Sequence, residues 1–347
     1  MNKLRKILKP LSVLYGEVTD LRNKAYDKNI IQVTVFDFPV ISVGNLSTGG
    51  TGKTPQVEYL IRLLKNDYRV AVLSRGYKRK SKGFIVAGKD ATAEQIGDEP
   101  MQYFLKFPEI IVAVDANRVN GIGQLRALDP KPDVIILDDA FQHRSVKAGL
   151  NILLTTFDKP YSKDEILPAG DLREKKSGAQ RAEIIVLTKC PEKLSEKEQF
   201  EKARELNPEL HQTVFFSAIT YDKNIISEKD LINIDDLKEY RILLVTGIAK
   251  TDPLVRFLES KDCKIKHLKF SDHHQFTTND LKKIRNEFSE LKEERKIILT
   301  TEKDYVRTPA FSEINVYFLP IQTKFISNQI DFDKIILKYV RENTGNS

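Results

Sequence analysis

The sequence is poor in cysteine, and its only two, Cys190 and Cys263, lie far apart in the chain. Neither belongs to a metal-binding spacing, so a disulfide framework and a cysteine-based zinc site are excluded, and reduced structural thiols in a cytosolic protein are expected. No apolar run reaches the ~18 residues of a membrane-spanning helix. A signal-peptide pattern, with an apolar centre and a small-residue cleavage site, is also missing.

A large excess of one charge is missing too. The 56 basic and 49 acidic side chains give a formal net charge of +7 over 347 residues. An excess this modest favours an anionic ligand or surface without identifying it. No RNA- or DNA-binding signature is present, so we expect no nucleic-acid partner, and no obligate protein partner is evident. The length suits two domains better than one.

Residues 1–28 predict an amphipathic helix. Apolar side chains recur at spacings of three and four, forming one stripe: Leu4, Ile7, Leu8, Leu11, Leu14, Tyr15 and Val18. Basic residues lie off this stripe, and Pro10 predicts a kink or a break. Two compatible interpretations follow: a helix packed on its own domain, or an interfacial helix on an anionic membrane.

From residue 29 onward, short apolar, β-branched runs alternate with helical stretches. The runs cover residues 40–43, 70–73, 110–114, 134–137, 152–154 and 184–187. Continuous apolar runs are typical of strands that are buried on both faces of a parallel sheet. Helical patterns at 56–64 and 99–107 lie between some of them. This order predicts a doubly wound α/β domain.

A smaller α/β domain is predicted over residues 221–319. Strand patterns at 241–245, 265–270 and 296–299 accompany a helical pattern at 279–292. Short strands at 213–217 and 316–319 bracket this region, and we expect them to form a two-strand hinge. The last helix, near 332–341, would return to the first domain, which then comprises 29–220 and 320–347.

The most specific motif is GNLSTGGTGKT at residues 44–54, between a buried strand and a helix. This is the context of a P-loop, which binds a nucleoside triphosphate such as ATP. Lys53 is expected to reach the β- and γ-phosphates, and the Thr54 hydroxyl to bind Mg²⁺. Ser47 stands where the usual first glycine would be. Backbone N–H groups should turn onto the phosphates at Gly49, Gly50, Thr51, Gly52, Lys53 and Thr54.

An acidic pair follows the strand predicted at 134–137. Asp138 and Asp139 resemble the end of a Walker-B strand, where a carboxylate holds Mg²⁺ directly or through water. Two adjacent carboxylates repel each other unless a cation lies nearby, which favours a metal or a basic partner. Either aspartate is a candidate ligand. His143 and Arg144 follow, and both are candidates to face bound phosphates.

A set of motifs in one order resembles the tetraacyldisaccharide 4′-kinase family of lipid A biosynthesis. They are the P-loop, SRGY at 74–77, GDEP at 97–100, DDAFQHR at 138–144, LPAGDLRE at 167–174 and SDHHQF at 271–276. The likeness covers nearly the whole chain, including TTEKD at 300–304. Ala140 departs from the DDGFQHR usual in that family, and alanine permits less unusual backbone geometry than glycine. We therefore expect a small shift of the turn.

The resemblance implies a kinase that transfers the γ-phosphate of ATP to the 4′-hydroxyl of a tetraacylated glucosamine disaccharide 1-phosphate. It also implies peripheral attachment to the cytoplasmic face of the inner membrane of a Gram-negative bacterium. By the same resemblance, Asp98 is the base that aligns the sugar hydroxyl. His273 of the second domain would orient it, with His274 as the alternative. Such a pair would assemble only when the domains close.

Several basic and aromatic side chains are candidates for contacts with the lipid's 1-phosphate, its sugars or the transferring phosphate. Arginine suits this role because its guanidinium is planar and binds phosphate through two hydrogen bonds. The candidates are Arg75, Tyr77, Arg118, His143, Arg144 and Arg173.

Two other functions fit parts of the sequence. A nucleotide-driven membrane switch would also combine a P-loop with a basic amphipathic helix. A soluble small-molecule P-loop kinase or ligase would use the N-terminus only for packing. The combination of GDEP with SDHH favours the lipid kinase, because it supplies groups that position a nucleophile.

Overall fold

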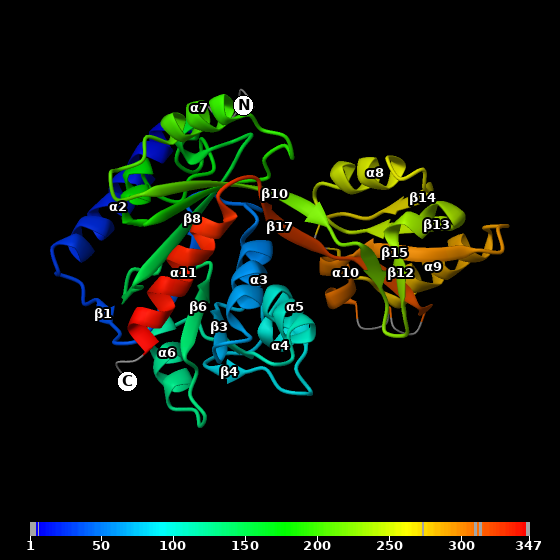
Figure 1. The fold of residues 1–347 in the computed structure, drawn as a ribbon, viewed down its shortest axis with the longest axis horizontal. Helices are drawn as coiled ribbons and strands as arrows, with labels where there is room; N and C mark the ends of the chain where they lie inside the picture. Colours follow the sequence, from blue (N-terminus) through cyan, green and yellow to red (C-terminus); the bar gives the residue numbers. More distant parts are fainter. Residues whose placement is uncertain (1–4, 6, 273, 309–310, 312–313, 345–347) are drawn as a thin grey trace. The chain divides into compact units, whose positions relative to one another are not determined.

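The computed structural model describes residues 5, 7–272, 274–308, 311 and 314–344. The chain divides into two compact units, one formed by Met1–Ile219 with Thr323–Ser347 and the other by Thr220–Gln322 (Figure 1). Each unit has its own sheet and its own hydrophobic core.

The first unit is built on a nine-stranded sheet in the order β17-β10-β9-β8-β2-β6-β3-β5-β4. Neighbouring strands from β10 to β5 run parallel, and β4 is antiparallel to β5. The strands are β2 (Val40–Asn45), β3 (Val70–Ser74), β4 (Ile85–Val86), β5 (Ile111–Val114), β6 (Val134–Asp138), β8 (Leu150–Thr156), β9 (Ile184–Thr188), β10 (Thr213–Tyr221) and β17 (Ile321–Phe325). A separate parallel pair joins β1 (Thr34–Val35) to β7 (Val146–Lys147).

Helices pack on both faces of this sheet, because successive residues of a strand point to opposite faces. Val70 and Val72 of β3 share a core cluster with α3, α5 and α11, whereas Ala71 and Leu73 share another with α6. The predicted doubly wound α/β fold is confirmed. The helices of this unit are α2 (Lys9–Asp27), α3 (Lys53–Leu64), α4 (Ala93–Ile96), α5 (Asp98–Lys106), α6 (Arg118–Arg126), α7 (Glu196–Leu206) and α11 (Gln329–Thr344), with 3-10 turns at Tyr161–Lys163 and Lys176–Arg181.

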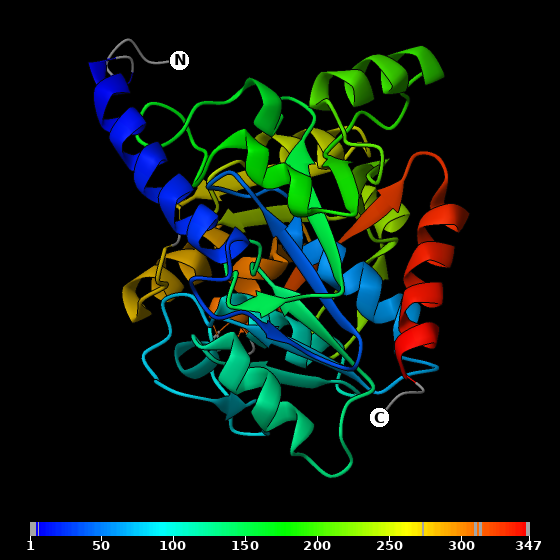
Figure 2. The same cartoon turned by 90° about the vertical axis from the view of Figure 1, so that its left-hand side faces the viewer.

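The helical segment breaks just before Pro10, one of the two outcomes that the sequence predicts: Arg5 and Ile7 are helical, Leu8 is a turn residue, and α2 follows it. The helix begins at Lys9, so the proline lies in its first turn. A missing N–H is tolerated there, because the first N–H groups of a helix have no partner within it. Figures 1 and 2 show α2 lying along the outside of the first unit.

The second unit has a six-stranded sheet in the order β12-β11-β16-β15-β13-β14. Its central strands are parallel, and β11 is antiparallel to both its neighbours. The elements are β11 (Asn224–Ile226), β12 (Leu231–Asn233), a 3-10 turn (Ile234–Glu239), β13 (Arg241–Thr246), α8 (Asp252–Glu259), β14 (Lys264–Lys269), α9 (Thr278–Ser289), β15 (Lys296–Thr301), α10 (Glu302–Arg307) and β16 (Val316–Leu319).

The two connecting strands differ in part from the predicted hinge. β10 does leave the first sheet and enters the second unit near its end, but residues 316–319 form β16, which pairs with β15 inside the second sheet. The chain returns through β17, which neighbours β10 in the first sheet. The sequence prediction chose the wrong strand because β16 is the more apolar of the two consecutive runs.

Candidate functional site

The phosphate-loop motif forms the turn between β2 and α3. β2 ends at Asn45 and α3 begins at Lys53, with Gly52 as its N-cap. Gly49 has a φ of +104° and Gly52 a φ of +87°, a region that side-chain-bearing residues rarely adopt. The loop therefore needs glycine at these two positions. It delivers the positive end of α3 to the carboxyl edge of the parallel sheet, as a phosphate cradle requires.

Contacts from distant segments fix the loop. Thr48 N–H donates to the Asp171 carbonyl at 2.7 Å, and the Thr188 hydroxyl donates to the Thr51 carbonyl at 2.7 Å. The Lys189 ammonium donates to the Gly50 carbonyl. Ser47 forms an isolated β-bridge with Leu172, so the serine at the usual first-glycine position joins the loop to LPAGDLRE. These carbonyls are thereby occupied and the loop is held in one shape.

Lys53 lies beside the side chains of Asn45 and Asp139. Its ammonium is 3.4 Å from Asn45 Oδ1 and 3.5 Å from Asp139 Oδ1. Arg173 Nη1 lies 3.2 Å from the same Asp139 oxygen. Burial raises the pKa of Asp139, but the charges of Lys53 and Arg173 outweigh it and hold that pKa below its usual value. Asp139 therefore stays ionised and aligns the two cations.

Asp138, at the end of β6, is almost fully buried. Its Oδ2 accepts hydrogen bonds from the Tyr103 hydroxyl at 3.3 Å and the Ser74 hydroxyl at 3.5 Å. Its Oδ1 is buried and has no hydrogen-bond partner among the described residues. Burial, with the nearby Asp139 charge, raises the pKa of Asp138 to about 7. An orphaned carboxylate oxygen beside a phosphate loop has the chemistry of a Mg²⁺ ligand.

No group of three or more His, Cys, Asp or Glu side chains in the described part of the chain could hold a metal alone. This is compatible with Mg²⁺, which is usually bound through one or two carboxylates together with substrate phosphates and water.

The turn after β6 places Asp139, not Ala140, in the left-handed region. Asp139 has a φ of +50°, and Ala140 is not among the residues with positive φ. An aspartate tolerates this conformation better than most residues. A close approach to this turn is made by Gly44 of β2, where a Cβ would lie 2.6 Å from Phe141 Cβ. The alanine therefore needs no special backbone geometry, and the expected shift of the turn has no cause here.

GDEP and SRGY pack against each other through glycines. A Cβ on Gly97 would lie 3.2 Å from Gly76 Cα, and a Cβ on Gly76 would lie 2.9 Å from the Ile96 carbonyl oxygen. Gly97 is the N-cap of α5, so Asp98 is the first residue of that helix. This contact brings the SRGY loop, and thus Arg75, beside the start of α5.

Arg75 and Tyr77 of the SRGY loop are exposed. They line a shallow pocket of about 380 Å³ with Ala116, which follows β5, and with other residues of their own loop: Gly76, Lys78, Arg79, Ser81, Lys82 and Gly83. Two of the predicted substrate contacts thus share one pocket of suitable charge for a phosphate.

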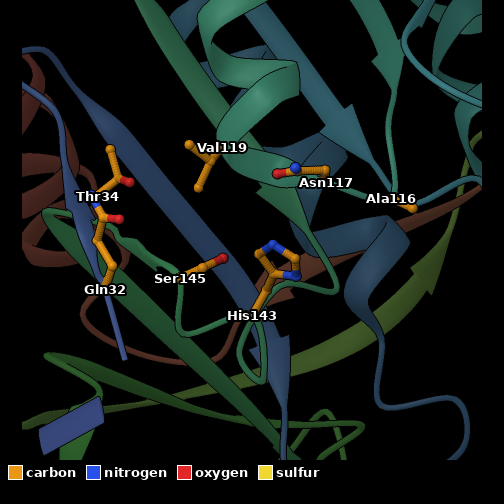
Figure 3. Close-up of a pocket in the computed structure, with 7 residues that line it drawn as sticks. All are labelled: Gln32, Thr34, Ala116, Asn117, Val119, His143 and Ser145. Atoms are coloured by element: carbon orange, nitrogen blue, oxygen red, sulfur yellow. The ribbon is translucent and has the colours of Figure 1, made fainter. Parts of the chain in front are cut away.

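His143 lines a second, larger hollow of about 650 Å³, shown in Figure 3 with Asn117 and Ser145. Its Nε2 accepts a hydrogen bond from the Arg118 N–H at 3.3 Å. Burial, followed by the charges of Arg118, Arg22 and Arg75, lowers the pKa of His143 to about 4. The imidazole is therefore neutral at physiological pH and acts as a hydrogen-bond acceptor, not as a cation for phosphate.

This neutral histidine predicts an acid-dependent loss of stability. The unfolded chain protonates His143 near pH 6.5 and the folded chain only near pH 4, so stability falls as pH is lowered through that window. His143→Gln should reduce the fall in Tm between pH 7 and pH 4.5 by a few degrees. Thermal unfolding at both pH values measures it. The exposed His211→Gln is the control, and an equal pH dependence in wild type and His143→Gln would contradict the prediction.

Arg144 is engaged by α2. Its Nη1 donates to the Asn23 carbonyl at 2.7 Å, its Nη2 pairs with Asp27, and its guanidinium lies over the Tyr26 ring at 5.3 Å. The predicted phosphate contact thus has a structural role at the end of α2.

A chain of polar contacts joins α2 to the phosphate loop. Asn23 Nδ2 donates to Glu174 Oε2 at 2.7 Å, and Gln142 Nε2 donates to the other Glu174 oxygen at 3.0 Å. Arg173 Nη1 bridges Gln142 Oε1 at 3.3 Å and Asp139. The sequence identifies Arg173 and Asp139 but not the buried Glu174 or the partly buried Gln142, which stand inside the same motifs.

The predicted partner of Asp98, His273, lies outside the described residues. His274 is described, and its Nε2 is 3.0 Å from Asp280 Oδ2, in the capping box of α9. Its ring centroid lies 4.7 Å from that of Phe270 and 5.0 Å from that of Phe276. These contacts give His274 a structural role within the second unit.

The apolar stripe of α2 faces outward. Leu11 is 56% exposed, Leu14 64% and Val18 60%, whereas Ser12 and Gly16 on the opposite side are buried. In one predicted alternative, the apolar stripe packs on its own domain. The structure differs from that alternative, because α2 packs through small residues and leaves its leucines exposed. No helix in the described part of the chain has the length and apolarity of a membrane span.

The chain matches known proteins over nearly its whole length. The family described as Tetraacyldisaccharide-1-P 4′-kinase matches residues 4–341. A Tetraacyldisaccharide 4′-kinase of Flavobacterium johnsoniae is 52% identical over 344 residues, covering 99% of each chain. One from Flavobacterium psychrophilum is 48% identical over 350 residues, covering 100% of each.

A solved structure is also similar. It is LpxK from Aquifex aeolicus, an "apo" form in complex with ATP, at a TM-score of 0.78 and 33% sequence identity. The match covers 97% of this chain and 99% of that one.

Proposed function

The chain belongs to the tetraacyldisaccharide-1-P 4′-kinase family and is an ATP-dependent kinase of lipid A biosynthesis, and we propose that it acts with Mg²⁺ at a membrane surface. The reaction transfers the γ-phosphate of ATP to the 4′-hydroxyl of a tetraacylated glucosamine disaccharide 1-phosphate. The observation that carries the assignment is the phosphate loop, whose Lys53 stands beside the ionised Asp139. The alternative of a nucleotide-driven membrane switch is not favoured by the family.

Phosphoryl transfer needs positioning and neutralisation of charge more than covalent chemistry. The loop N–H groups at 49–54 and Lys53 would bind the ATP phosphates. A bound Mg²⁺ would supply positive charge that neutralises the triphosphate. The Thr54 hydroxyl and Asp138 are the proposed protein ligands, because Asp138 Oδ1 is unpartnered among the described residues while Asp139 is already engaged by Lys53 and Arg173.

Asp98 is the proposed base, and His273 is the proposed residue that orients it. Support for Asp98 comes from its place as the first residue of α5, beside the SRGY loop. A sugar hydroxyl is a weak nucleophile, so a carboxylate that accepts its proton would assist transfer. Arg75 and Tyr77 are proposed to hold the acceptor's phosphate and sugar, with Arg173 closer to the transferring phosphate because it contacts Asp139.

Membrane attachment is proposed to occur through α2, on the cytoplasmic face of the inner membrane of a Gram-negative bacterium. The exposed leucines and Val18 would enter the interface, while basic residues of the same segment attract anionic headgroups. Acyl chains of the substrate would then stay in the bilayer while its sugars reach the site.

Charge placed on this stripe should release the protein from membranes. The double change Leu14→Glu, Val18→Glu removes two exposed apolar side chains and adds repulsion from anionic lipid, so binding should fall at least ~10-fold. The measurement is co-sedimentation with vesicles of phosphatidylethanolamine and phosphatidylglycerol. Phe200→Glu, on exposed α7, is the matched control. Equal binding by the double variant and wild type would refute attachment through α2.

The reaction itself is tested by incubating pure protein with ATP, Mg²⁺ and the disaccharide 1-phosphate lipid. Mass spectrometry should show one added phosphate on the lipid. Hydrolysis of ATP without phosphorylated lipid would support the membrane switch instead. Repeating the assay with chelator replacing Mg²⁺ tests the metal requirement separately.

A further inference from the structure

The Tyr103 hydroxyl joins the helix that begins with Asp98 to the proposed metal ligands. Tyr103 lies on α5 and is 0% exposed. Its hydroxyl donates to Asp138 Oδ2 at 3.3 Å, and it also forms a hydrogen bond with the Thr54 side chain. One phenol thus contacts a residue from the phosphate loop and a residue from the end of β6.

The Tyr103 hydroxyl acts as a hydrogen-bond donor toward the proposed metal ligand. Its single O–H donates to Asp138 Oδ2. Because Tyr103 and Ser74 both donate to Oδ2, the carboxylate is fixed with Oδ1 as its available oxygen.

Helices α3 and α5 are also joined through Glu58, and this contact does not involve the Tyr103 phenol. The fully buried Glu58 of α3 accepts from Gln102 Nε2 at 2.8 Å and pairs with Lys106 Nζ at 2.7 Å, both on α5. It also pairs with Arg62 Nη2 at 2.8 Å. A buried carboxylate with two cations and an amide is well satisfied, so it anchors α5 to α3 on its own. Removing the phenol oxygen should therefore leave both helices in place.

We propose that Tyr103 is a positioning residue for phosphoryl transfer, which orients the Asp138 carboxylate and the Thr54 hydroxyl toward a divalent cation. Residues behind metal ligands commonly set ligand orientation and tune metal affinity. The inference rests on the proposed assignment of Mg²⁺ to Thr54 and Asp138. On this inference, α5 carries Asp98 and also supports the metal site through Tyr103. The proposed base and this support of the metal site therefore share one rigid helix.

The test is Tyr103→Phe, which removes one oxygen and keeps the ring. Mn²⁺ binding to the complex with a non-hydrolysable ATP analogue, followed by electron paramagnetic resonance, should weaken about 10-fold. The apparent KM for Mg²⁺ should rise in parallel. Affinity for the analogue in chelator should stay within about twofold of wild type, a pattern that loss of packing alone would not give.

Tyr59→Phe is the matched control. Tyr59 lies on α3, and its hydroxyl donates to Asp333 Oδ1 at 2.7 Å. Its replacement therefore also removes a hydrogen-bonded phenol oxygen. Ser74→Ala, which removes the second donor to Oδ2, should weaken Mn²⁺ binding in the same direction by less. It also keeps the inference testable if Tyr103→Phe lowers Tm markedly.

These variants separate the role of Tyr103 from the assignment of the metal ligands. If Asp138→Asn weakens Mn²⁺ binding but Tyr103→Phe behaves like Tyr59→Phe, the role of Tyr103 is overturned and the metal assignment stands. If Asp138→Asn leaves Mn²⁺ affinity unchanged, the metal assignment fails and the inference about Tyr103 fails with it. Weaker binding in both Asp138→Asn and Tyr103→Phe, with Tyr59→Phe at wild-type affinity, supports the inference.

Discussion

Asp98→Ala is expected to lower kcat at least ~100-fold while ATP binding is retained, because a positioned general base contributes about 10²–10⁴-fold. Asp98 is the first residue of α5 and lies at the positive end of the helix dipole. The acceptor hydroxyl would lose the group that takes its proton. ATP should still bind, because its phosphates are held by the loop that opens a different helix, α3.

The measurement is kcat and KM for the lipid acceptor, together with the Kd of ATP. Glu196→Ala is the matched control, since Glu196 is also an acidic residue in the first turn of a helix of the same unit. Both changes remove a favourable interaction with a helix terminus of about 0.3–1 kcal/mol, so they should affect Tm similarly. Turnover of Asp98→Ala at the wild-type rate would remove Asp98 from the mechanism.

The parts of the fold predicted from sequence are those with local patterns. Buried parallel strands give continuous apolar runs, and the run 40–43 followed by the glycine-rich loop and GKT identifies β2, the loop and α3 together. Asp138 and Asp139 were found because they end such a run. Helix α6 is not predicted, since Gly121 and Gly123 weaken its helical pattern and its packing against β3 and β5 is not a local signal.

The parts that could not be predicted depend on contacts between distant segments. Tyr103 is an aromatic residue in an amphipathic helix, and nothing local distinguishes it from an ordinary core residue. Nothing local to Thr188 and Lys189 indicates their role either, and the structure shows them bonded to the phosphate-loop carbonyls. The stripe on α2 was read correctly as one face, yet periodicity does not tell whether a face meets protein or solvent.

Sequence alone also does not separate the two arginines predicted to bind phosphate, Arg144 and Arg173. Arg144 and Arg173 are equally good ligands by residue type. The structure separates them, because Arg144 is bonded to the end of α2 while Arg173 shares Asp139 with Lys53. Residue type defines what a side chain can bind, and the partners already around it decide whether it is available.

Lys53→Ala is expected to reduce kcat/KM for ATP about 10²–10³-fold, the usual loss when one preorganised electrostatic group is removed from a site of charge development. The Lys53 side chain is only 17% exposed and lies 3.5 Å from Asp139 Oδ1. Its removal deletes a phosphate contact and also leaves Asp139 with Arg173 as its remaining cation in this cluster. The pKa of Asp139 should then rise.

Lys65→Ala provides the control, because Lys65 lies at the other end of α3 and is also ion-paired, with Glu109. Steady-state kinetics and the Kd of a fluorescent ATP analogue distinguish the two lysines. The pattern also differs from that of Asp98→Ala: loss of Lys53 should weaken nucleotide binding as well as turnover, whereas loss of Asp98 should affect turnover alone. Normal kinetics in Lys53→Ala would mean that the triphosphate is bound elsewhere, and both Asp138 and Tyr103 would then lose their assigned roles.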